Sequence, residues 1–496
     1  MAFSSFPDVF SWIQKLPPIQ QWETPSKSLN LCPSCSSHPS LKLSLTNLKN
    51  TLVSLSIIAD YNLPISLWTS KKISPNPMSK KLLDHDGKTV STMLTNFIED
   101  VLKYCSNKAG PSSVKLPQTY LQNNIGETFN FSFLTLTFVV CIYEAPTDLR
   151  ASCLHALKEQ LACPRSRGVS KLLMRQMGSN IEERWMRSVN LAITNWISEL
   201  QAARAAVETP SPLFSYSFST LGLWKVQLYC PVIAMNVEKS SGSAPDDRLT
   251  FSLNYHQLEG VIQLNYKVAV QEKWIEIRVN TDNIRCDVVK LLTDSLMSER
   301  GAGASEKHFP SRIGLQITPA QQASVISVSV SKSSENASRE IGQERGIEAA
   351  FEPPSSIGLH FSAGESYTTS LRPWKFEPSV YGNTANLNWF LHDSEDGREV
   401  FSSKPSKLAL LHPKAWFKNR YSNANRPFTR QGGVIFAGDE YGESVSWKLD
   451  KTAMGRLMDW EIKGWIWLTY WPNQHRTFYT ETKRLDFTEI VHLNLT

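Results

Sequence analysis

Basic and aromatic side chains alternate in one stretch of this sequence, residues 398–430. Eight lysines and arginines stand there against a single acid, Glu399, and this surplus of seven exceeds the net charge of +6 of the 496-residue chain. Such cations bind phosphate groups, and aromatic rings interleaved with them stack on unpaired bases. Anionic lipid headgroups are attracted to the same charge. The sequence therefore predicts an anionic-partner site formed by Lys414, Trp416, Lys418, Arg420, Tyr421, Arg426 and Arg430.

The same stretch has a simpler interpretation, in which it is a solvated basic loop whose rings anchor it to a β core. Reversing the charge of four of its cations distinguishes the two, because retention on heparin or on anionic liposomes depends on those charges. Both interpretations stay open at the level of sequence.

A second group of candidate ligands is Cys32, Cys35 and His38, which contain the chain's only Cys-x-x-Cys motif. A tetrahedral zinc site needs a fourth ligand and usually a second closely spaced pair. Cys153 and His155 have the wrong spacing to complete a typical finger. A redox dithiol would need the βαβ setting of thioredoxin-like proteins. We therefore interpret these as incidental cysteines in a Ser-rich loop, and expect no metal and no cofactor.

Histidine stands beside carboxylates in residues 84–87 and 392–397, and these are residue types that acid-base catalysis uses. Both groups end in glycine, and aspartate is favoured in such turns because it caps the local backbone. The sequence contains no GxSxG, HExxH, phosphate-loop or dinucleotide-binding motif. It therefore favours a non-enzymatic protein. The alternative is an enzyme of unfamiliar class, with a site in the C-terminal β domain drawn from His392, Asp393, Asp439, Glu440, His475 and Arg476.

The helices and strands expected along the chain indicate an α+β protein. Two or three domains are expected, since the chain is longer than one hydrophobic core usually organises. Residues 1–212 read as an α+β region, with two strands in 41–68 and a buried strand at 128–143. Helical spacing of apolar residues predicts helices at 90–105, 148–161 and 180–207. The apolar run at 128–143 is shorter than the roughly 20 residues of a membrane-spanning helix, so we expect no transmembrane segment.

Residues 213–330 alternate apolar and polar side chains and predict an antiparallel β region, and residues 331–356 resemble a flexible linker or loop. Residues 357–496 contain eight of the fifteen tryptophans, with glycines between aromatic runs. This pattern predicts a Trp-rich β-sandwich or partly closed barrel at the C-terminus.

Three stretches of the last third are SLRPWKFEPSVYGNTANLNWFLHDS, NRPFTRQGGVIFAGDEYGESVSWK and WEIKGWIWLTYWPNQHRTFYTETKRL. They resemble an uncharacterised plant protein family. The resemblance implies a plant origin and brings no known activity with it.

The first 16 residues predict a short amphipathic helix that ends at Pro17. Lys15 is its only basic residue, whereas interfacial helices usually carry a basic face, so we expect it to fold onto its own domain. A peripheral membrane or lipid-associated protein that uses this helix is a second alternative. The eight scattered cysteines suit a reducing compartment, the cytoplasm or nucleus, with plastid import as the minor alternative. The expected function is that of an interaction or scaffold protein whose C-terminal β domain binds a protein or an anionic partner, either nucleic acid or lipid headgroups.

Overall fold

The structure, a computed structural model, divides the chain into two compact units that interleave along the sequence. Unit 1 consists of Met1–Pro212, Tyr229–Gln257 and Lys290–Ala304, and unit 2 of Leu213–Leu228, Leu258–Val289 and Ser305–Thr496. The structure describes residues 6–32, 40–48, 52–74, 82–83, 88–105, 114, 116–202, 214–232, 255–299, 307–333, 374–391, 434–437, 444–471 and 482–495. The predicted linker therefore lies outside the described residues, apart from 331–333.

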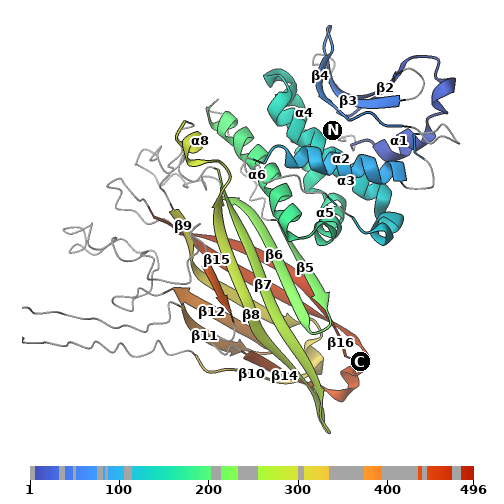
Figure 1. Cartoon of the computed structure of the whole chain (residues 1–496). Helices are drawn as coiled ribbons and strands as arrows, with labels where there is room; N and C mark the ends of the chain where they lie inside the picture. The colour runs from blue at the N-terminus through green and yellow to red at the C-terminus, as the bar shows by residue number, and fades with distance from the viewer. Residues whose placement is uncertain are drawn as a thin grey trace, which may run out of the picture. The chain divides into compact units, whose positions relative to one another are not determined.

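Unit 1 combines a small antiparallel sheet with a group of helices (Figure 1). The sheet has the order β1-β2-β3-β4, so each strand pairs with its neighbour in sequence. Its strands are β1 (Ser26–Asn30), β2 (Ser40–Leu48), β3 (Leu52–Asp60) and β4 (Ile65–Thr69). The helices are α1 (Val9–Lys15), α2 (Lys88–Leu102), α3 (Gln118–Glu144), α4 (Thr147–Ala162), α5 (Pro164–Met177), α6 (Ser179–Ala202) and α8 (Asp294–Glu299). The strands predicted in 41–68 and the helices predicted at 90–105 and 148–161 are confirmed, and the helix predicted at 180–207 is confirmed up to Ala202, where the described segment ends.

Helix α3 is the central element of unit 1, and the strand predicted at 128–143 is wrong. α1, α2, α4, α5, α6 and β4 all contact α3. Since so many of its sides are covered, its sequence lacks the polar stripe that marks a surface helix. Its β-branched Thr135 and Thr137 satisfy their hydroxyls within the helix, because each Oγ1 donates to the carbonyl four residues earlier, at 2.9 and 2.8 Å.

Residues Asn124–Glu144 of α3 are long and apolar enough, by length and composition, to cross a membrane. However, 78% of the most apolar window is buried inside the structure. A core helix passes the same test, so this segment is weak evidence for a membrane span. The terminal helix α1 also packs on α3, where the rings of Phe10 and Phe129 lie 5.5 Å apart. This is the arrangement expected of a terminal helix that folds onto its own unit.

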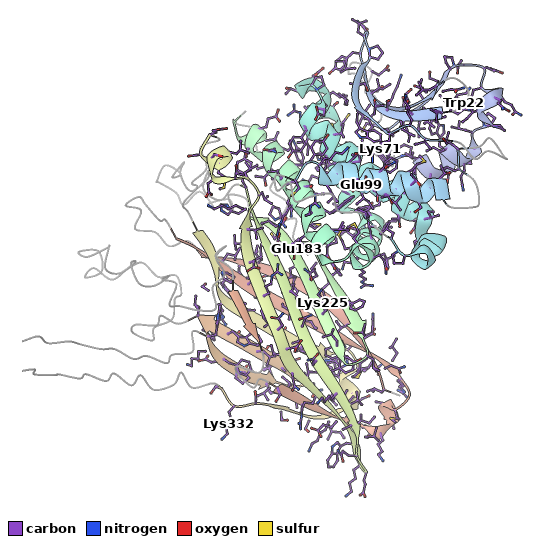
Figure 2. All side chains as sticks on the ribbon, in the orientation of Figure 1. Trp22, Lys71, Glu99, Glu183, Lys225 and Lys332 are labelled. Carbon is purple, nitrogen blue, oxygen red and sulfur yellow. The ribbon has the colours of Figure 1, made fainter. Side chains whose placement is uncertain are left out.

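Polar contacts tie the sheet of unit 1 to its helices. Lys71, which follows β4, places Nζ 3.1 Å from Oε2 of Glu99 on α2 (Figure 2). The hydroxyl of Tyr61, which follows β3, donates to Oδ1 of Asp148 on α4 at 2.7 Å. The sheet is therefore fixed against two helices that lie far from it in sequence.

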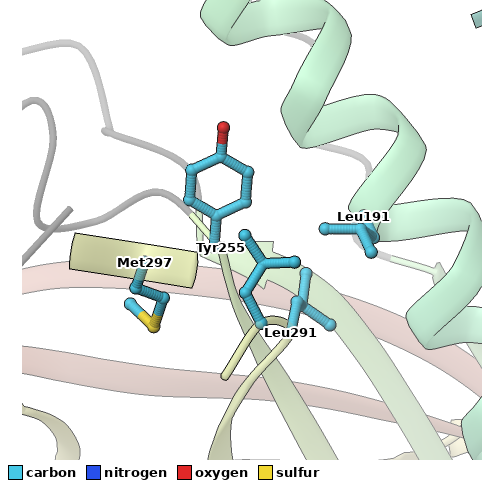
Figure 3. Packing of buried hydrophobic residues seen from close by; sticks show 5 residues of the cluster. Leu191, Tyr255, Leu291 and Met297 are labelled. Carbon is cyan, nitrogen blue, oxygen red and sulfur yellow. The ribbon is translucent and has the colours of Figure 1, made fainter. Parts of the chain in front are cut away.

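A small apolar cluster joins α6 to the later segments of unit 1, residues 229–257 and 290–304. Its five buried side chains are Leu191, Tyr255, Leu291, Leu292 and Met297 (Figure 3). Tyr255 has a φ of +66°, a left-handed conformation that tyrosine rarely adopts. Its carbonyl accepts a hydrogen bond from the amide of Leu291 at 2.6 Å. Packing and this hydrogen bond together hold a backbone conformation that costs free energy on its own.

Unit 2 is built from two antiparallel sheets. One has the order β10-β14-β8-β7-β6-β5, with β13 also paired to β8, and the other has the order β11-β12-β9-β15-β16. The strands are β5 (Phe214–Thr220), β6 (Leu223–Val232), β7 (His256–Val270), β8 (Trp274–Lys290), β9 (Lys307–Pro319), β10 (Val325–Val330), β11 (Trp374–Tyr381), β12 (Thr384–Leu391), β13 (Val434–Ala437), β14 (Ser444–Asp450), β15 (Leu457–Trp471) and β16 (Thr482–Asn494). Strands from residues 213–330 and from residues 357–496 thus lie in the same sheets.

Tryptophans form the core between these two sheets. Trp224 of β6 and Trp447 of β14 come from the seven-stranded sheet, and Trp460 of β15 comes from the five-stranded one. The ring centroid of Trp460 lies 5.5 Å from that of Trp224 and 4.8 Å from that of Trp447. Large buried rings stabilise such a core, because each removes much apolar surface from water. The predicted α+β class with a β-rich region is confirmed, and no closed barrel forms among the described strands.

Candidate functional site

None of the residues of the predicted anionic-partner site is among the described residues. This holds for Lys414, Trp416, Lys418, Arg420, Tyr421, Arg426 and Arg430. It also holds for Cys35, for His38, for residues 84–87 and for the six residues of the alternative enzyme site. The prediction for these positions stays a prediction.

The outer face of the five-stranded sheet carries a group of rings around one arginine. Along β9 the odd-numbered residues from 311 to 319 are buried, and the intervening Arg312, Gln316 and Thr318 are partly exposed. The same alternation applies to β12 and β15. We call the group the aromatic–arginine face; it consists of Arg312, Gly314, Asn388, Phe390, Trp465 and Trp467.

Arg312 lies between two rings that come from the strands on either side of it. Phe390 of β12 and Trp467 of β15 are both its direct cross-strand partners. The guanidinium carbon is 4.5 Å from the ring centroid of Phe390 and 4.4 Å from that of Trp467. Its Nη2 donates to Oδ1 of Asn388 at 3.2 Å. A cation within about 6 Å of a ring centroid is attracted to the ring face, so both rings attract the guanidinium of Arg312.

Gly314 makes room for this arrangement. A Cβ at this position would lie 3.1 Å from Oδ1 of Asn388, 3.2 Å from Cε3 of Trp465 and 3.6 Å from Cζ3 of Trp467. The indoles and the amide therefore approach the backbone of β9 more closely than a side chain would allow. Glycine at this point of the sheet lets the two tryptophans cover the backbone of β9.

Charged residues elsewhere on this outer face form short ion pairs along their own strands. Lys463 Nζ lies 2.9 Å from Oε2 of Glu461 on β15. Arg484 Nε lies 2.8 Å from Oδ1 of Asp486 on β16. Exposed pairs of this kind contribute little to stability, and they neutralise their own charge locally. Arg312 has two rings and the amide of Asn388 among its contacts.

The predicted basic stretch follows directly from this face in sequence. β12 ends at Leu391, the residue after Phe390, and the first cation of the stretch is Arg398. The chain thus attaches its most basic segment to the strand that carries one of the two rings around Arg312.

Metal-ligand residue types and histidine–carboxylate pairs are other reactive groups among the described residues. Among these residues, no group of three or more histidines, cysteines or acids is placed to hold a metal ion. A histidine–carboxylate pair occurs on the surface, where Nδ1 of His492 lies 2.7 Å from Oδ1 of Asp459. About half of each of these side chains is exposed, 53% and 50%, so this pair has the geometry of a surface ion pair.

Comparisons with known proteins name no relative. No protein-family model matches this chain, and no curated protein matches it in sequence. Solved structures that match include the Clostridium perfringens delta-toxin, at 10% identity over 57% of this chain and 90% of that one, with a TM-score of 0.20. The membrane-inserted form of the Clostridium perfringens NetB toxin matches at 9% identity over 57% and 100%, also with a TM-score of 0.20. A pore forming protein matches at 10% identity over 58% and 98%, with a TM-score of 0.16. Scores this low carry no argument about fold or function.

Sequence reasoning missed Arg312 altogether. The stretch WIWLTYW does place Trp465 and Trp467 two residues apart, which indicates one face of a strand. Nothing in the sequence shows that β9 inserts between β12 and β15, and only that pairing brings Arg312 to Trp467.

Proposed function

We propose that this chain is a non-enzymatic binding protein whose unit 2 binds single-stranded nucleic acid through the aromatic–arginine face and the basic stretch that follows β12. The observation that supports this most directly is Arg312, which lies between Phe390 and Trp467 on the outer face of a sheet, with its guanidinium carbon 4.5 and 4.4 Å from the two ring centroids. Of the two anionic partners predicted from sequence, nucleic acid and lipid headgroups, the proposal keeps nucleic acid.

A row of ring, guanidinium and ring across three strands suits a stacking ligand. Neighbouring strands lie about 4.8 Å apart, so the row from Phe390 to Trp467 spans roughly 10 Å. Bases stack on aromatic rings and on arginine planes with little dependence on sequence, at about 1–3 kcal/mol per base. Asn388 supplies an amide beside the row that is suited to hydrogen bonding with base edges.

The charge of the basic stretch supplies the second component, contact with phosphates. Single-stranded binding sites combine a cationic path for the backbone with rings for the bases. The stretch contains both residue types, and it follows a strand that already contributes Phe390. A lipid surface would use the same cations but has no planar group to stack on Phe390 or Trp467, so the rings of the aromatic–arginine face favour nucleic acid.

The experiment is a binding titration of the full chain with a fluorescein-labelled single-stranded oligothymidine in low salt. We expect binding by the unmodified protein. The variant K414E/K418E/R420E/R426E should lose it, and Arg312→Ala should weaken it about 10-fold, because a lost stacking contact costs about 1–3 kcal/mol. Arg484→Ala is the matched control, since Arg484 lies on the same face but pairs with Asp486.

Vesicles containing phosphatidylserine and immobilised heparin complete the experiment. Binding to vesicles without binding to the oligonucleotide would contradict the nucleic-acid proposal and support the lipid alternative. Equal affinity of the unmodified protein and the four-residue variant for the oligonucleotide would overturn the role of the basic stretch. Equal losses in Arg312→Ala and Arg484→Ala would overturn the role of the aromatic–arginine face.

A further inference from the structure

The outer face of the five-stranded sheet is arranged in rows that run across the strands. Cross-strand pairing aligns each outward residue of β9 with partners on β12 and β15, and these with partners on β11 and β16. The first row is Lys375, Phe390, Arg312, Trp467 and Arg484, the second is Glu377, Asn388, Gly314, Trp465 and Asp486, and the third is Ser379, Asn386, Gln316, Lys463 and Thr488. Successive rows are two residues apart along each strand, or about 7 Å. The third row therefore lies directly beside the aromatic–arginine face.

The charged side chains at both edges of the first two rows are paired with each other. Lys375 forms an ion pair with Glu377 on β11, and Arg484 forms one with Asp486 on β16. Each pair neutralises its own charge locally, so these cations offer little to a phosphate group. Recognition on the described part of this face therefore depends on the rings, on Arg312 and on neutral hydrogen-bonding groups.

The third row supplies such neutral groups. Asn386 of β12 and Gln316 of β9 are direct cross-strand partners, and we call them the amide pair. Both side chains are partly exposed, and the residues before and after each of them are buried. Within the described part of the chain, neither side chain has a hydrogen-bond partner. Since an amide group has an acceptor oxygen and two donor hydrogens, the pair can both donate to and accept from one ligand group.

The second row joins the amide pair to the rings. Trp465 is the cross-strand partner of Gly314, and Gln316 lies two residues further along β9. The indole is partly exposed, and the glycine leaves it close to the backbone of β9. A base stacked on Trp465 would thus have the amide pair about 7 Å away along the strand. In a nucleotide the sugar is attached directly to the base, so the sugar is the part that can reach this pair.

We infer that the nucleic acid bound on this face is RNA, and that the amide pair recognises the 2′-hydroxyl of a ribose whose base stacks on Trp465. The inference rests on the proposed function and names the class of nucleic acid. The 2′-hydroxyl donates and accepts hydrogen bonds, and it is the group by which a protein distinguishes RNA from DNA. Amide groups match both roles.

The composition of the third row favours RNA over DNA. Deoxyribose has only C–H bonds at the 2′ position, so an apolar side chain would suit it better than an amide. The third row consists of hydroxyl, amide and ammonium side chains, and none of them is purely apolar. With DNA, the amide pair would lose water on binding and gain no partner in return.

The test compares fluorescein-labelled oligouridine with oligodeoxyuridine of the same length, using fluorescence anisotropy and the full chain. The bases and the number of phosphates are identical, so only the 2′-hydroxyl differs. We expect about 10-fold tighter binding of the RNA, the size of effect that one or two hydrogen bonds give. Oligouridine with 2′-O-methyl groups should bind about as weakly as the DNA, because it has lost the donor.

The variant N386A/Q316A should lose this preference, by weakening RNA binding about 10-fold while DNA binding stays the same. DNA binding also shows that the variant is folded. The matched control is Thr488→Ala, which changes an exposed residue of the same row on β16, two strands from Gln316, and should keep the full preference. The single variants Asn386→Ala and Gln316→Ala should each lose part of the preference, and they replace the double variant if it does not fold.

The possible failures are distinguishable. Equal affinity of the unmodified protein for RNA and DNA would overturn this inference and leave the proposed function intact. A preference for RNA that persists in N386A/Q316A, or that Thr488→Ala loses to the same extent, would overturn the role of the amide pair. Absence of binding to both oligonucleotides would contradict the proposed function itself.

Discussion

The ring of Phe487 on β16 occupies the space beside Gly464 on β15, and the two residues are direct cross-strand partners. A Cβ at position 464 would lie 2.0 Å from Cζ of Phe487, well inside any real contact distance. Phe487 is 5% exposed, so its ring has little room to move away. Because Gly464 has no side chain, the ring of Phe487 can pack directly against the backbone of β15.

Replacing Gly464 by alanine should destabilise unit 2 by about 1–3 kcal/mol, the usual cost of overpacking a core. The reason is that Phe487 must leave its position or β15 must shift. Urea unfolding followed by tryptophan fluorescence measures the change, because the core of unit 2 is rich in tryptophan. An unchanged midpoint would show that the ring moves aside freely.

The same substitution at Gly168 should have the opposite sign. Gly168 lies inside α5, and a Cβ there meets nothing within 4 Å. Glycine in a helix interior is less favourable than alanine by about 0.5–1 kcal/mol. Gly168→Ala should therefore raise the thermal midpoint of unfolding, which differential scanning calorimetry can detect. A lowered midpoint would contradict the packing described around α5.

Asp8 caps helix α1 and links it to α3. Its Oδ1 accepts hydrogen bonds from the amide of Ser11 at 2.9 Å and from Nδ2 of Asn130 at 2.8 Å. Partial burial acts to raise the pKa of Asp8, but these hydrogen bonds, a second one from the Ser11 hydroxyl and the charge of Arg165 together hold it below 3.8. Asp8→Ala should cost about 0.5–2 kcal/mol, as the loss of a cap usually does.

The stabilisation by the Asp8 charge has a defined dependence on pH. Because the folded state lowers this pKa, the contribution is complete above the unfolded value near 3.8 and disappears as the pH falls through the lower folded value. Asp8→Asn keeps an acceptor oxygen without the charge. The difference in thermal midpoint between Asp8→Asn and the unmodified protein should therefore shrink in acid, and a difference that stays constant would contradict the shift.

Two core tryptophans allow one hydrogen bond to be isolated. Nε1 of Trp447 donates to the carbonyl of Asn383 at 3.0 Å, whereas Nε1 of Trp460 is buried with no hydrogen-bond partner among the described residues. Both side chains are 0% exposed. Trp447→Phe should destabilise more than Trp460→Phe by about 0.5–1.5 kcal/mol, because it removes a hydrogen bond to the carbonyl of Asn383 that Trp460 does not make. Equal losses in urea unfolding would argue against that hydrogen bond.

The proposed nucleic-acid site also predicts a salt dependence. Each phosphate contact to a single strand contributes about −0.7 to the slope of log K against log salt concentration. The variant K414E/K418E/R420E/R426E should therefore flatten the slope, while Arg312→Lys should weaken binding with little change in slope, because lysine keeps the charge but loses the planar stacking group. Fluorescence anisotropy at several salt concentrations measures both.

How far the sequence predicts this fold depends on how each element is buried. α2 and the strands β2 and β3 have a covered face and an open one, so their periodicity shows in the residues. α3 is covered on many sides, and the alternation of Phe129, Phe131 and Phe133 then resembles a strand although the segment is a helix. Where all faces of an element are apolar, the alternation of apolar and polar residues disappears. The spacing of residues then cannot distinguish a helix from a strand.

The site was harder to predict than the elements, because it depends on pairing between distant segments. Arg312, Phe390 and Trp467 meet only because β9 inserts between β12 and β15. Spacing along one segment carries no information about such neighbours.

The chain passes between its two units five times, at residues 212, 228, 257, 289 and 304. During synthesis, the side chains of Tyr255, Leu291 and Met297 therefore become available to unit 1 only after its first sheet and helices have been made. A fragment that stops at Pro212 would expose Leu191 without the side chains that cover it. Neither unit is one continuous stretch of sequence, so neither can be expressed alone as a single uninterrupted segment of this chain.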